Sequence, residues 1–166
     1  MKKDTGYTLP AQEEKAQYLQ KNFDQIAAAY DRFNDLFTGG MHRIWKRKTI
    51  RKALEGIKTG TGANRVSVLD LCSGSGDLAL GFARNNQDRK VLALDFSAEM
   101  LSVLNAKRPA DMKNLNIVQG DAMNLPAAYA GLFDIVSIGY GIRNLTDPRR
   151  GLDEAYRALK PGGMLV

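Results

Sequence analysis

The sequence is poor in the residues that build disulfides, metal cages and histidine-based catalytic sites. Its 166 residues include one cysteine, Cys72, and one histidine, His42. One cysteine excludes an intrachain disulfide and a cysteine-built zinc cage, and we expect no metal site. One histidine also argues against a Ser–His–Asp triad and against a histidine-rich metal centre.

Long apolar stretches are missing as well. The opening residues, MKKDTGYTLPAQEEKAQ, contain no apolar core of a signal peptide, and no uninterrupted apolar run approaches the roughly 20 residues that span a bilayer. We therefore expect a cytoplasmic protein. The length is that of one domain, which is enough to bury about two-thirds of the surface of the unfolded chain.

Positive charge is concentrated in one segment. The chain has a net charge of +6, and residues 40–58 alone hold seven basic residues against the single acid Glu55, which gives 7 − 1 = +6. Such a helix suits nucleic acid, an anionic membrane surface or a solvated face. Because Trp45 is the only aromatic residue among these charges, the segment is a poor platform for stacking bases, and we expect no nucleic-acid partner.

The pattern of the N-terminal third predicts helices. Apolar residues spaced four, three, four, three and four apart predict one stripe of an amphipathic helix, or of two short ones, in which every member except Tyr30 packs in the ordinary way. These residues are Leu19, Phe23, Ile26, Tyr30, Phe33 and Phe37. The two glycines of TGGMH end this stretch, and RIWKRKTIRKALEGI then predicts a basic helix closed by Gly56.

The rest of the chain alternates short apolar runs with helical stretches. Strands are predicted over residues 65–71, 90–96, 115–121 and 133–140, with a fifth beginning at Met164 after the KPGG turn. Helices are predicted from Asp77, from Ala98 with Ser97 as its cap, and over residues 148–159. This alternation predicts an α/β fold with a doubly wound parallel sheet, in which ligands bind beyond the carboxyl ends of the strands.

Three acidic residues fall at those carboxyl ends. Asp70, Asp95 and Asp121 follow or close the first three strands, so we expect them to converge on one rim of the sheet. Asp95 lies nineteen residues beyond Gly76, the spacing at which a carboxylate accepts hydrogen bonds from ribose hydroxyls. Each such charge-assisted bond contributes roughly 1.5–3 kcal/mol.

The loop LDLCSGSGDLAL, residues 69–80, separates two classes of ligand. Gly74, Gly76 and Ala79 satisfy the G-x-G-x-x-A pattern of a dinucleotide-binding turn. However, Asp70 and Cys72 lengthen the loop and place an anion where a pyrophosphate would bind. S-adenosylmethionine has no phosphate, and an acid near this loop can meet its ammonium group, so the pattern favours S-adenosylmethionine over NAD.

Several motifs together resemble one family. VLDLCSGSGDLA, LALDFSAEML, GDAMNLP, FDIVSIGYGIRNLTD and ALKPGG are similar to the motif series of class I S-adenosylmethionine-dependent methyltransferases. With FDQIAAAYDRFNDLFTGGMHRIWKR they resemble the ubiquinone/menaquinone biosynthesis C-methyltransferases from about Phe23 onward. The chain departs from that pattern at Phe33 and Phe37, where the family usually has Met. It also departs at Cys72, where many methyltransferases have the first glycine of the loop.

The resemblance implies residue roles and a Rossmann-like class I methyltransferase fold. The implied cofactor contacts are Asp70, Gly74, Ser75, Gly76, Asp95, Phe96, Asp121, Ala122 and Gly139. The implied catalytic residues are Arg143 and Asn144, which would face a quinol ring, together with Tyr30 and His42, the latter as an alternative to water as proton acceptor. Alternatively, His42 is a structural residue that forms hydrogen bonds within the fold, and Arg143 pairs with Asp147.

The implied activity is methylation of a ring carbon of a prenylated quinol in quinone biosynthesis, with S-adenosylhomocysteine as product. We expect one domain, in which residues 1–60 form a helical lid and residues 61–166 form the α/β part that binds the cofactor. Because a prenylated quinol resides in the bilayer, we also expect the lid to make peripheral contact with the inner face of the membrane. The alternatives are an RNA or small-molecule methyltransferase, an NAD-dependent oxidoreductase, and a cofactor-binding protein without catalysis.

The position at which the chain stops gives a final expectation. The family continues beyond MLV with the rest of the fifth strand, a helix and two more strands. We therefore expect a C-terminally truncated sheet of order 3-2-1-4-5 with a short fifth strand, whose edge a second chain, in a homodimer for example, would cover.

Overall fold

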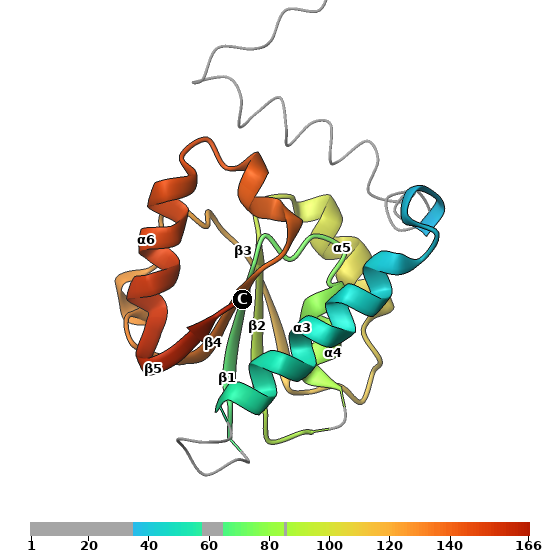
Figure 1. Cartoon of the computed structure of the whole chain (residues 1–166), viewed down its shortest axis with the longest axis horizontal. Coiled ribbons are helices and arrows are strands. Elements are labelled where there is room, and N and C mark those ends of the chain that lie inside the picture. The colour runs from blue at the N-terminus through green and yellow to red at the C-terminus, as the bar shows by residue number, and fades with distance from the viewer. Residues whose placement is uncertain (1–34, 58–64, 85) are drawn as a thin grey trace, which may run out of the picture.

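The computed structural model describes residues 35–57, 65–84 and 86–166. A five-stranded sheet of order β3-β2-β1-β4-β5 lies at its centre, and every pair of neighbouring strands is parallel (Figure 1). The order predicted from the sequence is confirmed, as is the α/β fold class.

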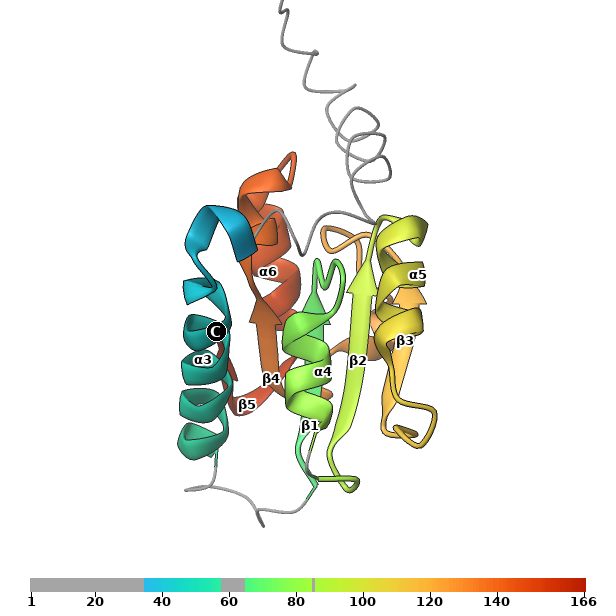
Figure 2. The ribbon, with the colours of Figure 1, turned by 90° about the vertical axis from the view of Figure 1, so that its right-hand side faces the viewer.

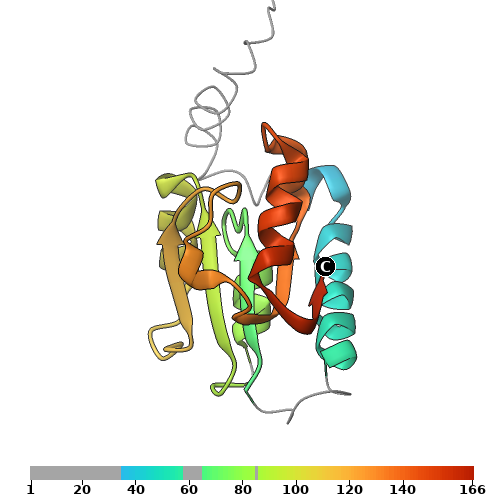
Figure 3. The ribbon, with the colours of Figure 1, turned by 90° about the vertical axis from the view of Figure 1, so that its left-hand side faces the viewer.

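The strands are β1 (Ser67–Leu71), β2 (Lys90–Asp95), β3 (Leu115–Gln119), β4 (Phe133–Ile138) and β5 (Leu159–Leu165). The α-helices are α3 (Met41–Ile57), α4 (Asp77–Ala83), α5 (Ala98–Lys107) and α6 (Pro148–Ala158), with short 3-10 helices η2 (Ala127–Tyr129) and η3 (Tyr140–Asn144). Figures 2 and 3 show α3, α4 and α5 on one face of the sheet and α6 on the other.

Two predicted helix starts carry side-chain caps, of which only Ser97 was expected from the sequence. The Ser97 hydroxyl accepts a hydrogen bond from the Met100 amide at 3.1 Å, which caps α5. At α6 the Asp147 carboxylate accepts from the Arg150 amide at 3.0 Å, and Pro148 occupies the first turn. These side chains replace partners that the first amides of a helix lack, so both helices begin where the sequence predicts.

The central strand divides the core into two layers. Val68 of β1 packs with Phe82 of α4 on one face of the sheet, whereas Leu69 and Leu71 pack with Ala155 of α6 on the other. This is the two-residue alternation of a strand that is covered on both faces. Asp70, between the two leucines, therefore points to the α4 side.

The start of the fifth strand differs from the prediction. β5 begins at Leu159 rather than at Met164, because Leu159 already pairs with Phe133 of β4. The register then shifts, and Met164 pairs with Ile135, so the residues of KPGG form an irregular bulge within the strand. Pro161 has no amide proton to donate and Gly162 has a φ of 78°, which is why this part of the ladder cannot be regular.

The basic helix begins earlier than predicted, and Gly56 lies within it instead of terminating it. Gly39 and Gly40 have φ values of 54° and 77°, and α3 starts directly after them at Met41. Gly56 lies inside the last turn of α3, where a Cβ would be 2.2 Å from the Met164 methyl group. Gly56 therefore lets α3 approach β5 closely.

The predicted aromatic stripe is described only at its last member. Phe37 is 74% exposed, so ordinary packing of this residue is a wrong prediction. The other five members lie outside the described residues. None of the described helices is long and apolar enough to span a bilayer.

Gly76 gives a testable prediction about the loop before α4. Its φ is 86°, and a Cβ would lie 2.0 Å from the Leu104 side chain, which is fully buried. We expect Gly76→Ala to destabilise the fold by about 2–4 kcal/mol, because left-handed backbone and an overpacked core both cost energy. Urea unfolding followed by circular dichroism measures this change.

Gly131→Ala is the matched control. Gly131 also has a positive φ, 64°, but nothing lies within 4 Å of its Cβ position. This variant should cost only about 1–2 kcal/mol, the backbone part of the penalty. Equal losses in the two variants would show that contact with Leu104 contributes nothing.

Candidate functional site

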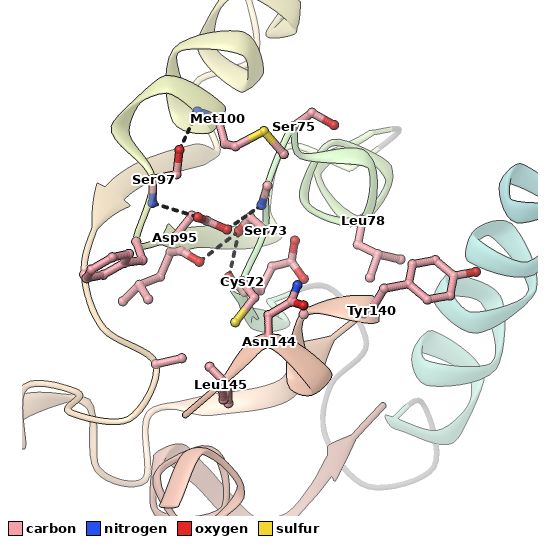
Figure 4. Close-up of a pocket in the computed structure, with 18 of the residues that line it drawn as sticks. Cys72, Ser73, Ser75, Leu78, Asp95, Ser97, Met100, Tyr140, Asn144 and Leu145 are labelled. Atoms are coloured by element: carbon pink, nitrogen blue, oxygen red, sulfur yellow. Dashed lines mark hydrogen bonds between the residues drawn. The ribbon is translucent and has the colours of Figure 1, made fainter. Parts of the chain in front are cut away.

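A pocket opens at the carboxyl edge of the sheet, where β1, β2 and β4 end (Figure 4). Its wall includes all three strand-end acids, Asp70, Asp95 and Asp121. Their convergence on one rim, expected from the sequence, is confirmed. The three carboxylates nevertheless have different surroundings, which decide what each can bind.

Asp70 is directed into the protein. Its residue is 1% exposed, Oδ2 accepts from the Ala79 amide of α4 at 3.1 Å, and Oδ1 accepts from the Ser137 hydroxyl of β4 at 2.6 Å. Burial raises the pKa of Asp70 to about 7, against the opposing effect of these hydrogen bonds. Asp70 therefore holds β1, β4 and the first turn of α4 together, and both of its carboxylate oxygens have partners within the protein.

Asp95 faces the glycine loop. Its Oδ2 accepts from the Gly74 amide at 2.7 Å and its Oδ1 accepts from the Ser97 amide at 2.9 Å. The residue is half-buried on the pocket wall. A carboxylate oxygen can accept more than one hydrogen bond, so these two contacts do not prevent Asp95 from also accepting from a diol.

The structure changes which acid is expected to repel the pyrophosphate of a dinucleotide. The sequence suggested Asp70 as the repelling anion, yet the carboxylate beside the loop amide of Gly74 belongs to Asp95. The Ala79 amide in the first turn of α4 is also already donated to Asp70. A pyrophosphate would compete with two of the protein's own carboxylates for these amides, which is unfavourable for NAD.

The loop after β3 forms another part of the wall. Asp121 Oδ1 accepts from the Met123 amide at 2.8 Å, and Asp121, Ala122 and Phe96 all line the pocket. The far end of this loop is fixed by α6, because the Leu125 amide donates to Glu154 at 2.7 Å. The expected cofactor contacts on this side are therefore brought together.

The loop glycines have separate tasks. Gly74, with a φ of 55°, and Ser75 line the pocket, as expected. Gly76 is not among the lining residues, and its lack of a Cβ serves packing against Leu104. Close backbone approach to a ligand is thus available at Gly74 and not at Gly76.

Cys72 is the one residue other than glycine with a positive φ, 53°, in the described parts of the chain. Its side chain packs where a Cβ of Gly141 would be, 2.2 Å from the Cys72 Cβ, and it lines the pocket. Burial, followed by the negative charges of Asp95, Asp70 and Asp121, raises the pKa of the Cys72 thiol to about 12.

The segment after β4 only partly enters the pocket. Gly139, Tyr140, Gly141 and Asn144 line it. Arg143 is exposed and is absent from the wall, and no ion pair joins it to Asp147 within the described residues. The structure therefore places Asn144, but not Arg143, against the pocket.

His42 lies outside the pocket wall. Its Nε2 is 2.8 Å from Asp35 Oδ1, and Arg43 Nε donates to the same oxygen at 2.7 Å. Hydrogen bonds from Arg43 and then His42 lower the pKa of Asp35 to about 2. His42 Nδ1 is buried without a partner among the described residues. Tyr30 lies outside the described residues.

Sequence reasoning missed part of the wall. Lys46 of α3, Leu78, Met100, Met123 and Tyr140 also line the pocket. Lys46 and Tyr140 lie within motifs quoted above, MHRIWKR and GYGIRN, but the sequence did not predict that their side chains would line the pocket. Leu78, Met100 and Met123 gave no signal beyond ordinary helix and loop composition.

Cys72 provides a direct chemical test of this geometry. At pH 8 a thiol of pKa about 12 has about 10³-fold less thiolate than one at its ordinary value of 9.0, and the thiolate is the nucleophile. We expect iodoacetamide to alkylate the native protein at least about 100-fold more slowly than the same protein in urea. Intact-mass spectrometry measures both rates on the only thiol of the chain.

Similar alkylation rates in native and unfolded protein would contradict a half-buried thiol surrounded by acids. The rate in the native protein should also rise about tenfold per pH unit between pH 7 and 9, because the thiolate fraction does so well below the pKa.

Comparison with known proteins identifies the family. The model of the ubiE/COQ5 methyltransferase family matches residues 11–166. A demethylmenaquinone methyltransferase of Leptospira interrogans is 36% identical over 164 residues, which are 98% of this chain and 64% of that protein. The ubiquinone/menaquinone biosynthesis C-methyltransferase UbiE of Haemophilus ducreyi is 40% identical over 164 residues, 97% of this chain and 60% of that protein. The chain thus spans less than two-thirds of the length of these relatives.

The fold also has solved counterparts. The crystal structure of the YcgJ protein from Bacillus subtilis matches with a TM-score of 0.58 and 29% identity, over 69% of this chain and 49% of that one. The strand order, the loop after β1 and the family match over nearly the whole sequence agree. The chain belongs to the ubiE/COQ5 methyltransferase family.

Proposed function

We propose that the protein uses S-adenosylmethionine to methylate a ring carbon of a prenylated quinol such as demethylmenaquinol. The observation that carries this proposal is the pocket at the carboxyl edge, whose ligand-facing acids, Asp95 and Asp121, suit a nucleoside without phosphates. Relatives named as demethylmenaquinone and ubiquinone/menaquinone methyltransferases support the substrate class.

The pocket residues fit the parts of this cofactor. Asp95 would accept the two ribose hydroxyls, and Asp121 with Ala122 would lie near the adenine amine. Phe96 offers a half-exposed ring at the same end, while Gly74, Ser75 and Gly139 supply close backbone approach. When bound, S-adenosylmethionine supplies an electrophilic methyl group.

The buried state of Asp70 suits methyl transfer. The reaction removes the positive charge of the sulfonium, so a carboxylate beside the sulfur would stabilise the ground state more than the transition state. The two carboxylate oxygens of Asp70 accept hydrogen bonds from the Ala79 amide and the Ser137 hydroxyl, and burial raises the pKa of this carboxyl to about 7. The protein thereby keeps this acid at the pocket floor without directing its charge at the reacting centre.

The quinol would lie over the rim formed by η3. Asn144, on the pocket wall, would hold a quinol oxygen, and the exposed guanidinium of Arg143 beside it would favour the quinol anion, which activates the ring carbon. In this proposal water accepts the hydroxyl proton, because His42 does not line the pocket. The ring carbon then forms the new bond to the methyl group as the sulfur–methyl bond breaks and S-adenosylhomocysteine leaves, and the proton displaced from that carbon returns to the quinol oxygen.

Binding and turnover test the function directly. We expect calorimetry to detect S-adenosylhomocysteine binding, and mass spectrometry to detect methylated product after incubation with S-adenosylmethionine and demethylmenaquinol in detergent. Methylation of RNA instead of the quinol would contradict the substrate assignment. Binding without any transfer would leave a cofactor-binding protein, and binding of NADH alone would overturn the cofactor assignment.

Asp95 gives the sharpest single-site prediction for the cofactor. Asp95→Ala should weaken S-adenosylhomocysteine binding by more than about tenfold, since it removes acceptors for the ribose hydroxyls. Glu99→Ala is the matched control, because Glu99 is an exposed acid in the first turn of α5 and does not line the pocket. Equal dissociation constants for Asp95→Ala and the unchanged protein would rule out the ribose assignment.

The first turns of α3 and the residues just before it support membrane contact. Large apolar side chains stand exposed on residues 36–45: Leu36, Phe37, Met41, Ile44 and Trp45. Exposed Arg47 and Lys48 follow on the same helix. We propose that this surface rests on an anionic bilayer, which would bring the pocket rim to the lipid-borne quinol.

The structure refines the test of that surface. Lys46 pairs with Asp77 and Arg43 pairs with Asp35, so Arg47 and Lys48 are the suitable residues to neutralise. The double variant Arg47→Gln/Lys48→Gln should bind phosphatidylglycerol vesicles about tenfold or more weakly in a sedimentation assay, at about 1 kcal/mol per basic residue. Lys90→Gln/Lys113→Gln removes the same charge at the other edge of the sheet and should bind as before. Equal binding by the two double variants would contradict the proposal.

A further inference from the structure

Lys46 is the only lysine or arginine on the pocket wall within the described residues. It comes from α3, whereas Asp70, Asp95 and Asp121 lie at the carboxyl ends of the strands. Its side chain is 17% exposed, so the ammonium is largely withdrawn from bulk water. A cation in such a position is costly unless it has a partner, and it is correspondingly effective toward a bound anion.

Lys46 shares its carboxylate partner, Asp77, with a second lysine. Its Nζ donates to Asp77 Oδ2 at 2.8 Å and lies 5.9 Å from the centre of the Tyr140 ring. Lys107 Nζ donates to the other oxygen of Asp77 at 3.0 Å. Burial works to raise the pKa of Asp77, but the two lysines outweigh it and hold that pKa below its ordinary value.

Two ammonium groups therefore share the ionised carboxylate of Asp77, so Lys46 is not its sole partner. An ammonium carries three N–H donors, and the contact with Asp77 uses one of those on Lys46. The remaining donors can reach a ligand anion without breaking the pair.

Asp95 lies on the other side of the cavity from Tyr140, the ring beside Lys46 (Figure 4). Asp121 also lines the pocket. A ligand whose diol lies on Asp95 would extend toward Tyr140 and Lys46. S-adenosylmethionine has this shape, with adenosine at one end and an amino-acid tail, bearing one carboxylate, at the other.

We propose that Lys46 binds the α-carboxylate of the cofactor's amino-acid tail. The inference rests on the proposed function for the identity of the cofactor, and it adds the residue that distinguishes a full amino-acid tail from one without a carboxylate. It also gives α3 a direct part in cofactor binding: a cofactor on Asp95 and Lys46 would bridge the sheet and the N-terminal helix.

The test compares two ligands across three variants by calorimetry. The ligands are S-adenosylhomocysteine and its decarboxylated analogue, which keeps the adenosine, the sulfur and the amine. The unchanged protein should bind the first at least about tenfold more tightly. Lys46→Gln should weaken S-adenosylhomocysteine about 10- to 100-fold and leave the analogue within about twofold, whereas Lys46→Arg, which keeps the cation, should restore most of the preference.

Lys107→Gln is the matched control, because Lys107 pairs with the same carboxylate but does not line the pocket. It should leave the ratio of the two affinities unchanged. Equal weakening of both ligands by Lys46→Gln would overturn the inference and make Lys46 a brace between α3 and α4. Unchanged affinities with lost quinol turnover would overturn it too, and would assign Lys46 to the substrate anion. Failure of the unchanged protein to bind either ligand would instead refute the proposed cofactor.

Discussion

The hydrogen bonds of one buried carboxylate organise the site. Asp70 joins the end of β1 to Ser137 of β4 and to the first turn of α4 through the Ala79 amide. Ser73, within the loop, also donates to the Asp70 backbone carbonyl at 2.8 Å. Because Asp70 is buried at the centre of the sheet, leaving its oxygens unpaired would be costly, and the loop between β1 and α4 is held in one conformation.

The other features of the pocket depend on this fixed loop. Cys72 adopts a left-handed conformation directly after β1, and the Gly74 amide then meets Asp95 at the end of β2. The second acid, Asp121, is fixed separately by its own loop, which α6 anchors through Glu154. The wall of this one cavity thus carries Asp95 and Asp121, which suit a nucleoside, and also Lys46 with its partner Asp77.

The sequence predicted the strands, their order and the convergence of the three acids, because strand periodicity and the geometry of parallel sheets determine these features. It did not predict where Asp70 points, because that depends on the partners that β4 and α4 present to it. It placed a glycine cap at Gly56, whereas the residue allows α3 to approach Met164. The position of Lys46 follows from this docking of α3, in which Ala53 and Ile57 join the core, and such long-range packing leaves no local signal in the sequence.

We propose that Asp95 and Lys46 bind the two ends of an S-adenosyl amino acid, while the Asp70 carboxylate is engaged within the fold. The decisive measurement is a crystal structure of the protein with S-adenosylhomocysteine. We expect ribose hydroxyls on the Asp95 carboxylate, the ligand carboxylate within hydrogen-bond distance of Lys46 Nζ, and no ligand contact to the Asp70 side chain. A ligand in the reverse orientation, or one whose ammonium displaces Ala79 from Asp70, would contradict it.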